Sequence, residues 1–306
     1  MRPNLSADAA QEILEREAIV RLMENASVEM TIHDEPHLTA CGTLLRGSVN
    51  VYVSYLPKQN WEQTQRTVMA VRAAGFEPIP HVPARQIEDH AQLEDLLRRF
   101  AAGVAVRRIL LIAGDRRTPL GPFGSTIDVL QTGLLANHGI QGIIVAGHPE
   151  GHPSIPAQAL RANERAKVEA AQRAGLDVTF LTQFCFTAAP IISWIQQLRA
   201  NGIRSPVVAG LAGPARLATL VKYAAICGIG PSLRNLGARA GALSQLATER
   251  GPETIIRALA RAACDGTVDL AGVHFFSFGG LTRTCTWLSG AARGQIRLSA
   301  DTFYVD

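Results

Sequence analysis

Short apolar segments alternate with segments of helical spacing along this chain, and the alternation restricts the fold more than any other feature of the sequence. The apolar segments have the length and residue types of buried strands. There are eight of them, at residues 27–32, 49–55, 76–81, 109–113, 142–147, 177–182, 206–210 and 272–277. Eight strands with a helix between most neighbours, in a chain of 306 residues, predict an α/β fold of the (β/α)8 type, a TIM barrel.

The helical segments support the same arrangement. They cover residues 61–74, 88–102, 125–137, 157–174, 188–201, 215–227 and, as the last of them, 253–264. Several precede a glycine, which ends a helix by adopting the left-handed conformation: Gly75, Gly103, Gly139, Gly175 and Gly202. We expect a single barrel domain over residues 26–306, preceded by an N-terminal helical segment over residues 1–25. A doubly wound open sheet competes with it, but no G-x-G-x-x-G motif follows any strand.

Composition excludes several classes of protein. The chain is 47% apolar and 18% charged, which is typical of a globular protein, and it has no apolar run long enough for a transmembrane helix. Five cysteines without a CxxC spacing argue against a disulfide framework and a structural zinc site, and we expect a cytoplasmic protein. The net charge of +4 fits either anionic ligands or ordinary surface variation, and the dispersed basic residues do not predict nucleic-acid binding.

Polar residues gather where the predicted strands end, which is where barrel enzymes carry their chemistry. In chain order they are Glu29, Ser54, Tyr55, His81, Gly114, Asp115, His148, Glu150, His152, Thr182, Gln183, Gly210, His274 and Ser277. Glu29 lies inside an apolar strand, so burial is expected to raise the pKa of its carboxyl, as suits a general acid. A salt-bridged structural residue is the alternative for Glu29.

Asp115 and Gln183 are the next candidates. Gly114 allows a flat ligand to approach the backbone, and the Asp115 carboxylate can accept hydrogen bonds from ring nitrogens. The Gln183 amide can both donate and accept, as the edge of a heterocycle requires. The alternatives are a helix N-cap or a turn aspartate for Asp115 and a structural amide that ties the barrel wall together for Gln183.

A metal site is a further interpretation of the fifth strand end. His148, Glu150 and His152 are spaced by two, and His33 and His37 follow the first strand. Pro149 and Pro153 force turns in this segment, however, so alternate side chains need not share one side. We expect no metal here, and a metal-dependent hydrolase remains the less favoured class.

The strand ends fall within an ordered series of motifs. The series is Ser27-Val-Glu-Met30, Val51-Tyr-Val-Ser-Tyr55, His81, Ala113-Gly-Asp115, Val145-Ala-Gly-His-Pro-Glu-Gly-His-Pro153, Asn163 with Lys167, and Thr182-Gln-Phe-Cys-Phe186. In order and spacing it resembles the methylenetetrahydrofolate reductase family of flavin-dependent barrels, over roughly residues 25–285. The Pro-Glu-Gly-His-Pro element, followed about thirty residues later by Thr-Gln-Phe, is its most specific part.

The resemblance implies an oxidoreductase that interconverts 5,10-methylenetetrahydrofolate and 5-methyltetrahydrofolate. Hydride from NADH or NADPH would reach the folate through bound FAD, and a homo-oligomer is possible. By resemblance, Glu29 is the general acid, Asp115 tunes the pterin and flavin rings, and Gln183 binds the pterin edge. The implied FAD contacts are Ser54, His81, Gly114, Asp115, His148, His152, Asn163 and Lys167, and further substrate contacts are Leu217 and Arg283.

The chain also departs from the family pattern. Ala113 replaces an arginine, His148 replaces a ring-stacking tyrosine, and Leu217 stands where an aromatic residue is expected. Other departures are Ser125, Thr126, Leu160, Ala166 and Thr187. A flavin-free reductase with direct hydride transfer and a non-redox, pterin-binding methyltransferase-type barrel are therefore the alternatives. Residues 228–250 suggest a helical insertion in which Arg234, like Arg283, could meet a glutamyl carboxylate.

Overall fold

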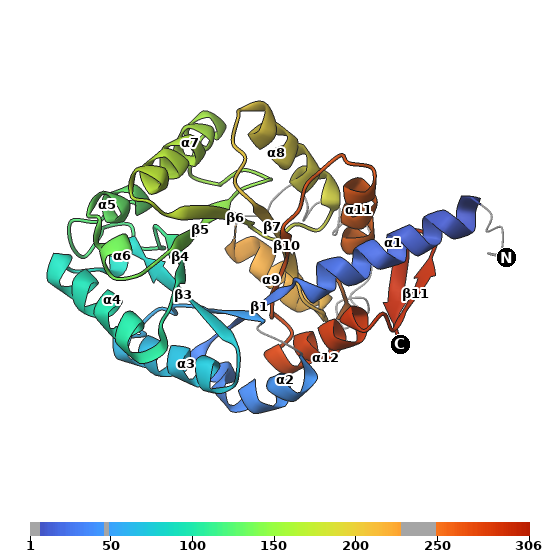
Figure 1. The fold of residues 1–306 in the computed structure, drawn as a ribbon, viewed down its shortest axis with the longest axis horizontal. Helices are drawn as coiled ribbons and strands as arrows, with labels where there is room; N and C mark the ends of the chain where they lie inside the picture. The colour runs from blue at the N-terminus through green and yellow to red at the C-terminus, as the bar shows by residue number, and fades with distance from the viewer. Residues whose placement is uncertain (1–6, 46–48, 228–248) are drawn as a thin grey trace.

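The computed structural model describes residues 7–45, 49–227 and 249–306. Eight parallel strands close into a barrel in the order β1-β10-β7-β6-β5-β4-β3-β2, which confirms the predicted fold (Figure 1). The strands are β1 (Ser27–Met30), β2 (Asn50–Val53), β3 (Glu77–Pro83), β4 (Arg108–Ile112), β5 (Gly142–Gly147), β6 (Asp177–Thr182), β7 (Val207–Ala212) and β10 (Gly272–Phe276). Each of the eight predicted apolar segments overlaps one of them.

Helices surround the barrel (Figure 1). They are η1 (Ile32–His37), α2 (Leu38–Leu44), α3 (Trp61–Ala73), η2 (Ala84–Gln86), α4 (His90–Val104), α5 (Thr126–Gln131), α6 (Leu134–Asn137), α7 (Ala157–Arg173), α8 (Ala188–Ala200), α9 (Leu217–Ile226), α11 (Glu253–Cys264) and α12 (Leu281–Ala292). The seven predicted helical segments correspond to α3, α4, α5 with α6, α7, α8, α9 and α11.

The structure corrects three details of the predicted helices. The segment at 125–137 is divided at Gly133, which has a φ of 70°. Helix α4 continues through Gly103, because Val104 is buried, and the left-handed residue is Ala105, with a φ of 51°. Helices α2 and α12 were not predicted, since threonine and glycine give them weak helical propensity. Burial of one face against the barrel stabilises α12 instead, through Leu281, Cys285 and Leu288.

The interior of the barrel is filled with side chains. Tyr52, Ile79, Leu110, Ile144 and Leu181 form a buried apolar cluster inside it, and a larger core lies between the strands and the helices. A filled interior leaves the two ends of the barrel as places where a ligand can bind. The two ends are lined by different residues, because one end is formed by the starts of the strands and the other by their carboxyl ends.

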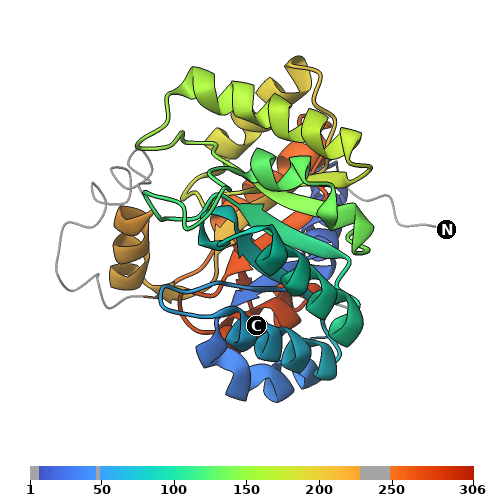
Figure 2. The same cartoon turned by 90° about the vertical axis from the view of Figure 1, so that its left-hand side faces the viewer.

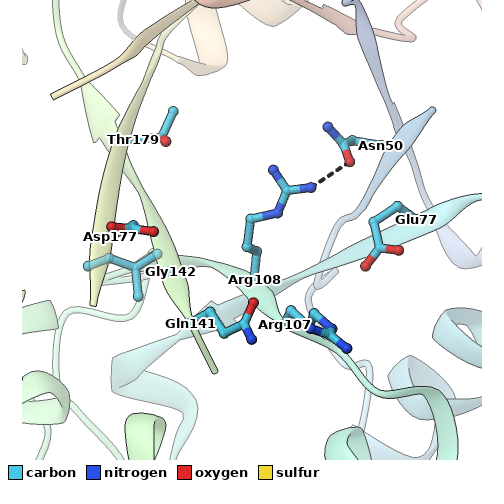
Figure 3. A pocket seen from close by; sticks show the side chains of 9 residues that line it. Asn50, Glu77, Arg107, Arg108, Gln141, Gly142, Asp177 and Thr179 are labelled. Atoms are coloured by element: carbon cyan, nitrogen blue, oxygen red, sulfur yellow. Dashed lines mark hydrogen bonds between the residues drawn. The ribbon is translucent and has the colours of Figure 1, made fainter. Parts of the chain in front are cut away.

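The end where the strands begin contains an open cavity of about 400 Å³ (Figure 3). Arg108 lies at its centre and donates a hydrogen bond from Nη2 to Asn50 Oδ1 at 2.8 Å. The cavity is also lined by Glu77, Arg107, Gln141, Gly142, Ile143, Asp177 and Thr179. Apart from the glycine and isoleucine these are polar residues, and none belongs to the predicted site, which lies at the opposite end.

The predicted N-terminal helix is α1 (Ala7–Glu24), and it lies along α11 and α12 (Figure 1). An unpredicted hairpin, β11 (Ile296–Ser299) with β12 (Thr302–Val305), covers the same region. Glu15 of α1 is buried and forms salt bridges with Arg257 at 2.9 Å and with Arg261 at 2.8 Å. These salt bridges join α1 to α11, the helix that carries both arginines.

Two short strands, β8 (Ala215–Arg216) and β9 (Glu249–Arg250), pair next to α9. Helix α9 stands at the side of the barrel that faces left in Figure 2. The insertion suggested at residues 228–250, including Arg234, lies almost entirely outside the described residues. Across residues 7–45, 49–227 and 249–306, no helix has the length and apolar character needed to cross a membrane.

Candidate functional site

Glu29 of β1 lies between two imidazoles where the strands end. Its Oε2 atom is 3.4 Å from Nε2 of His81 on β3 and 3.5 Å from Nε2 of His274 on β10. Its Oε1 atom accepts a hydrogen bond from Ser54 Oγ at 2.7 Å. The side chain of Glu29 is 18% exposed, whereas that of His274 is fully buried. Closure of the barrel therefore places a carboxylate and two imidazoles, from three strands, around one point.

Neighbouring groups hold this cluster in place. Ser27 Oγ lies 2.9 Å from Nδ1 of His274, and the Tyr52 ring packs against the His274 ring with centroids 4.4 Å apart. Among the described residues, Oε2 of Glu29 and the Nε2 atoms of both histidines have no hydrogen-bond partner, because 3.4–3.5 Å exceeds an ordinary hydrogen bond. Buried polar atoms of this kind are rare in folded proteins outside functional sites.

The prediction that burial raises the pKa of the Glu29 carboxyl is wrong. Burial does act to raise it, but the charge of His81 and contacts with His274 outweigh burial and hold the pKa of the Glu29 carboxyl below its ordinary range. Burial also lowers the pKa of His274, although Glu29 opposes this. Burial of Glu29 is visible in the sequence, whereas the two imidazoles that face its carboxylate come from other strands and are not. Glu29 is therefore a carboxylate at neutral pH in the protein without substrate.

Gln183 contacts Cys227, at the end of α9, and the charges of Glu29 and Asp115 act on the Cys227 thiol. Gln183 Nε2 donates a hydrogen bond to the carbonyl oxygen of Cys227 at 3.2 Å. Burial raises the pKa of the Cys227 thiol, and the nearby carboxylates of Glu29 and Asp115 raise it further. Cys227 was not among the predicted site residues, because a single cysteine after a helix carries no recognisable signal.

The alternatives for Asp115 and Gln183 have different outcomes. Asp115 is exposed in a bend after β4, as a turn aspartate would be, and it does not cap α5, whose N-cap is Ser125. Gln183 is half-buried and does connect the barrel wall to α9. Gly114 has a φ of 87°, and a Cβ there would lie 2.8 Å from Cβ of Pro83. Its turn and this close approach therefore require glycine whether or not a ligand lies nearby.

His148 and His152 form a second group, after β5. Their rings meet edge to face with centroids 5.4 Å apart. Burial lowers the pKa of His148 to about 4, assisted by the charges of Lys167 and His152, so this imidazole is neutral at pH 7. Glu150 instead lies beside Cys185, where burial and then Glu150 raise the pKa of the thiol. Within the described ranges, no group of three or more His, Cys, Asp or Glu residues is placed to hold a metal ion.

Lys167 approaches this second group from α7. Burial lowers the pKa of its ammonium group, and Glu164 opposes the change. The Glu164 carboxylate accepts a hydrogen bond from Trp194 Nε1 at 2.8 Å. Within the part of the chain that the structure describes, Lys167 forms no ion pair, so a partly buried cation faces the end of β5.

The remaining predicted residues lie in other surroundings. Asn163 is exposed on α7, one turn before Lys167. Leu217 is only 3% exposed at the start of α9. Arg283 is exposed on α12, with Nη1 3.5 Å from Glu249 Oε1. Ser54 and His81, which the resemblance assigned to FAD, both contact Glu29 in this structure.

An aromatic cluster at the ends of β6 and β10 was not predicted. The rings of Tyr223 and Phe278 stack 4.1 Å apart, and Phe276 stacks on Phe278 at 5.7 Å. Phe276 also meets the edge of His274, with centroids 4.9 Å apart. Phe184 and Phe186 complete the cluster. Its only sequence signal is the alternation of phenylalanines with polar residues at two strand ends.

A family model described as methylenetetrahydrofolate reductase matches residues 48–279. In backbone the chain is similar to dihydropteroate synthase from Thermus thermophilus, with 11% identity, a TM-score of 0.46, and 88% of this chain and 90% of that chain covered. It is also similar to 3-dehydroquinate dehydratase from Aquifex aeolicus, with 9% identity, a TM-score of 0.48, and 89% and 99% covered. The family match includes His274 and begins after Glu29.

Proposed function

The chain belongs to the methylenetetrahydrofolate reductase family, and from this we propose that it interconverts 5,10-methylenetetrahydrofolate and 5-methyltetrahydrofolate with FAD and a nicotinamide. The observation that carries the proposal is the position of Glu29. It is a carboxylate at the mouth of the barrel, next to two imidazoles, and its charge, like that of Asp115, acts on the Cys227 thiol. Proton transfer to a bound heterocycle requires such a group.

Glu29 and its neighbours would transfer the proton that the folate gains in one direction and loses in the other. In the reductive direction, Glu29 receives a proton from the histidine cluster and donates it to the nitrogen that leaves the five-membered ring. In the oxidative direction, the Glu29 carboxylate accepts that proton as the ring closes. Gln183 would bind the pterin edge, and Asp115 would adjust the charge near the reacting rings. The same residues serve both directions, as microscopic reversibility requires.

The residues beside β5 fit a flavin dinucleotide. Lys167 is a partly buried ammonium group without an ion pair among the described residues, which suits a diphosphate. The neutral imidazole of His148 lies next to it, with its ring against that of His152, and Asn163 lies one turn away on the same helix. When bound, the flavin supplies hydride transfer between the nicotinamide and the folate.

A visible spectrum of the purified protein tests the proposal. We expect flavin absorbance, bleaching of that absorbance by NADH or NADPH, and its return when methylenetetrahydrofolate is added. A colourless protein that oxidises NADH or NADPH with methylenetetrahydrofolate would establish direct hydride transfer, the alternative that His148 in place of tyrosine favours. Binding of methyltetrahydrofolate without any redox reaction would point to the methyltransferase-type alternative. Failure to bind any folate would refute the proposed function.

Replacing Lys167 by Ala should weaken FAD binding and leave folate binding unchanged. A hydrogen bond to a charged group contributes about 1.5–3 kcal/mol, so the Kd for FAD should rise roughly tenfold to a hundredfold. Flavin fluorescence quenching measures this Kd. Lys167→Arg should keep most of the affinity, and Arg173→Ala, which removes an exposed charge from the same helix, should have no effect. An unchanged Kd in Lys167→Ala would place the phosphates elsewhere.

A further inference from the structure

We propose that Ser27 and His274 act together as a positioning pair for Glu29. The Ser27 hydroxyl donates a hydrogen bond to Nδ1 of His274, and this directs the N–H at Nε2 toward Oε2 of Glu29. The inference rests on the proposed function, because it concerns the residue that we assign to the proton transfer. His274 acts through Glu29 and is a positioning residue rather than a catalytic one.

Barrel closure brings the pair together. Ser27 and His274 are direct partners in the register of β1 with β10, although they lie 247 residues apart in the chain. Ser27 is 4% exposed and His274 is 0% exposed. Tyr52 and Phe276 pack against the His274 ring with centroids 4.4 and 4.9 Å away. Packing on these sides leaves the imidazole little freedom to turn its ring nitrogens away from Ser27 and Glu29.

The distances favour one tautomer of His274. The Ser27 hydroxyl is 2.9 Å from Nδ1 of His274 but 3.5 Å from the carbonyl oxygen of Val273, so its hydrogen belongs on the Nδ1 side. A neutral imidazole carries one N–H, which then stands at Nε2, 3.5 Å from Oε2 of Glu29. The other tautomer would direct a lone pair at a carboxylate, which is repulsive.

Other ionisable groups also act on this cluster. His81 faces the same oxygen of Glu29 from β3, and Tyr52 packs between the two histidines from β2. Arg108 acts on Tyr52 from the opposite end of the barrel, and Asp115 and Cys227 lie on the mouth side. These groups remain in place when His274 is changed, so a change in the behaviour of Glu29 can be assigned to His274.

The pair has a definite consequence for oxidation of methyltetrahydrofolate. In that direction the Glu29 carboxylate would accept the proton that the substrate loses, and bound flavin would supply the hydride acceptor. The N–H of His274 stabilises the carboxylate, so its removal should make Glu29 bind its proton more tightly. The rate of flavin reduction by methyltetrahydrofolate should then begin to rise at a higher pH than in the unmodified protein.

Stopped-flow flavin bleaching tests the pair. His274→Gln should slow bleaching by methyltetrahydrofolate roughly tenfold to a hundredfold, as loss of an orienting partner typically does, and move the rising limb of the pH profile upward. Ser27→Ala should shift the same limb, and Ser27→Thr, which keeps the hydroxyl, should restore it. His138→Gln, at a surface pair with Glu94, is the matched control and should leave the profile unchanged. NADH or NADPH should bleach the flavin at an unaltered rate in all variants.

Nitrogen-15 NMR of labelled histidines tests the tautomer without folate. His274→Gln identifies the resonances, which should show an unprotonated Nδ1 and a protonated Nε2, and Ser27→Ala should perturb them. Protonation at Nδ1, or a pH profile that is the same in all active variants, would overturn the proposed pair. If the unmodified protein shows the expected tautomer but does not oxidise methyltetrahydrofolate, the proposed function fails while the Ser27–His274 contact stands.

Discussion

Replacing Glu29 by Gln should slow both directions of the folate half-reaction by a factor on the order of 10²–10⁴, the usual effect of losing a general acid or base. Glutamine has nearly the same shape and can keep the hydrogen bond from Ser54 Oγ, but it can neither hold nor release the proton. Stopped-flow measurement of flavin oxidation by methylenetetrahydrofolate, and of flavin reduction by methyltetrahydrofolate, gives the two rates directly.

The same variant should retain its flavin and its reaction with the nicotinamide. Glu29 is not itself among the residues assigned to FAD, its replacement by glutamine leaves Lys167, His148, His152 and Asn163 unchanged, and hydride transfer from NADH or NADPH needs no proton from it. Glu94→Gln, an exposed change on α4, serves as the control for loss of a carboxylate. Folate rates equal to those of the unmodified protein would remove Glu29 from the proton transfer. Equal loss of both half-reactions would show instead that the variant has disturbed the flavin site.

Replacing Glu15 by Gln should lower the free energy of unfolding by about 3–5 kcal/mol at pH 7, the typical cost of breaking a buried ion pair from one side. The side chains of Glu15 and Arg257 are each only 7% exposed. Without the carboxylate, the hydrogen bond that Arg257 keeps among the described residues is the one to the carbonyl oxygen of Thr302, at 2.8 Å. Arg261 is less affected, because it also lies 3.7 Å from the exposed Asp301. Urea unfolding followed by circular dichroism measures the loss.

Acid should remove this difference. Burial acts to raise the pKa of Glu15, but Arg261 and Arg257 outweigh it, so the folded-state pKa lies below the ordinary value of 4.5. The stabilisation is therefore complete above pH 4.5 and is lost as the pH falls through the folded-state pKa. Glu12→Gln, an exposed change on the same helix, should have little effect at any pH. If the free energies of unfolding of the unmodified protein and Glu15→Gln differ by the same amount from pH 7 into acid, packing rather than charge holds α1 in place.

Local patterns were sufficient to predict the barrel and most of its helices. Strand residues with buried side chains on both faces form apolar runs, and each run of this chain becomes one barrel strand. The patterns failed at α12 and at the β11–β12 hairpin, which are stabilised mainly by contacts with distant parts of the chain. Cys285, for example, is completely buried on a helix rich in threonine. Such burial cannot be read from neighbouring residues.

The candidate site divides in the same way. The sequence was sufficient to identify Glu29, Asp115, Gln183, His81 and Lys167 as candidates, because each follows or ends an apolar run or belongs to a motif. It could not assign partners to them. Ser54 and His81 contact Glu29, and the aromatic cluster around Phe278 adjoins His274 through Phe276. The contact of His81 with Glu29 joins β3 to β1, which are not consecutive strands in the chain.

The eight strands of the barrel, the family, and the place of Glu29 at the end of the first strand could all be predicted from the residues alone. The ionisation of Glu29 depends instead on the folded arrangement. Burial alone would raise its pKa, whereas His81 and His274 lower it, and those two imidazoles reach the carboxylate only when β3 and β10 take their places beside β2 and β1. The protonation of a buried group depends on every charge within a few ångströms, and the closed barrel sets those distances.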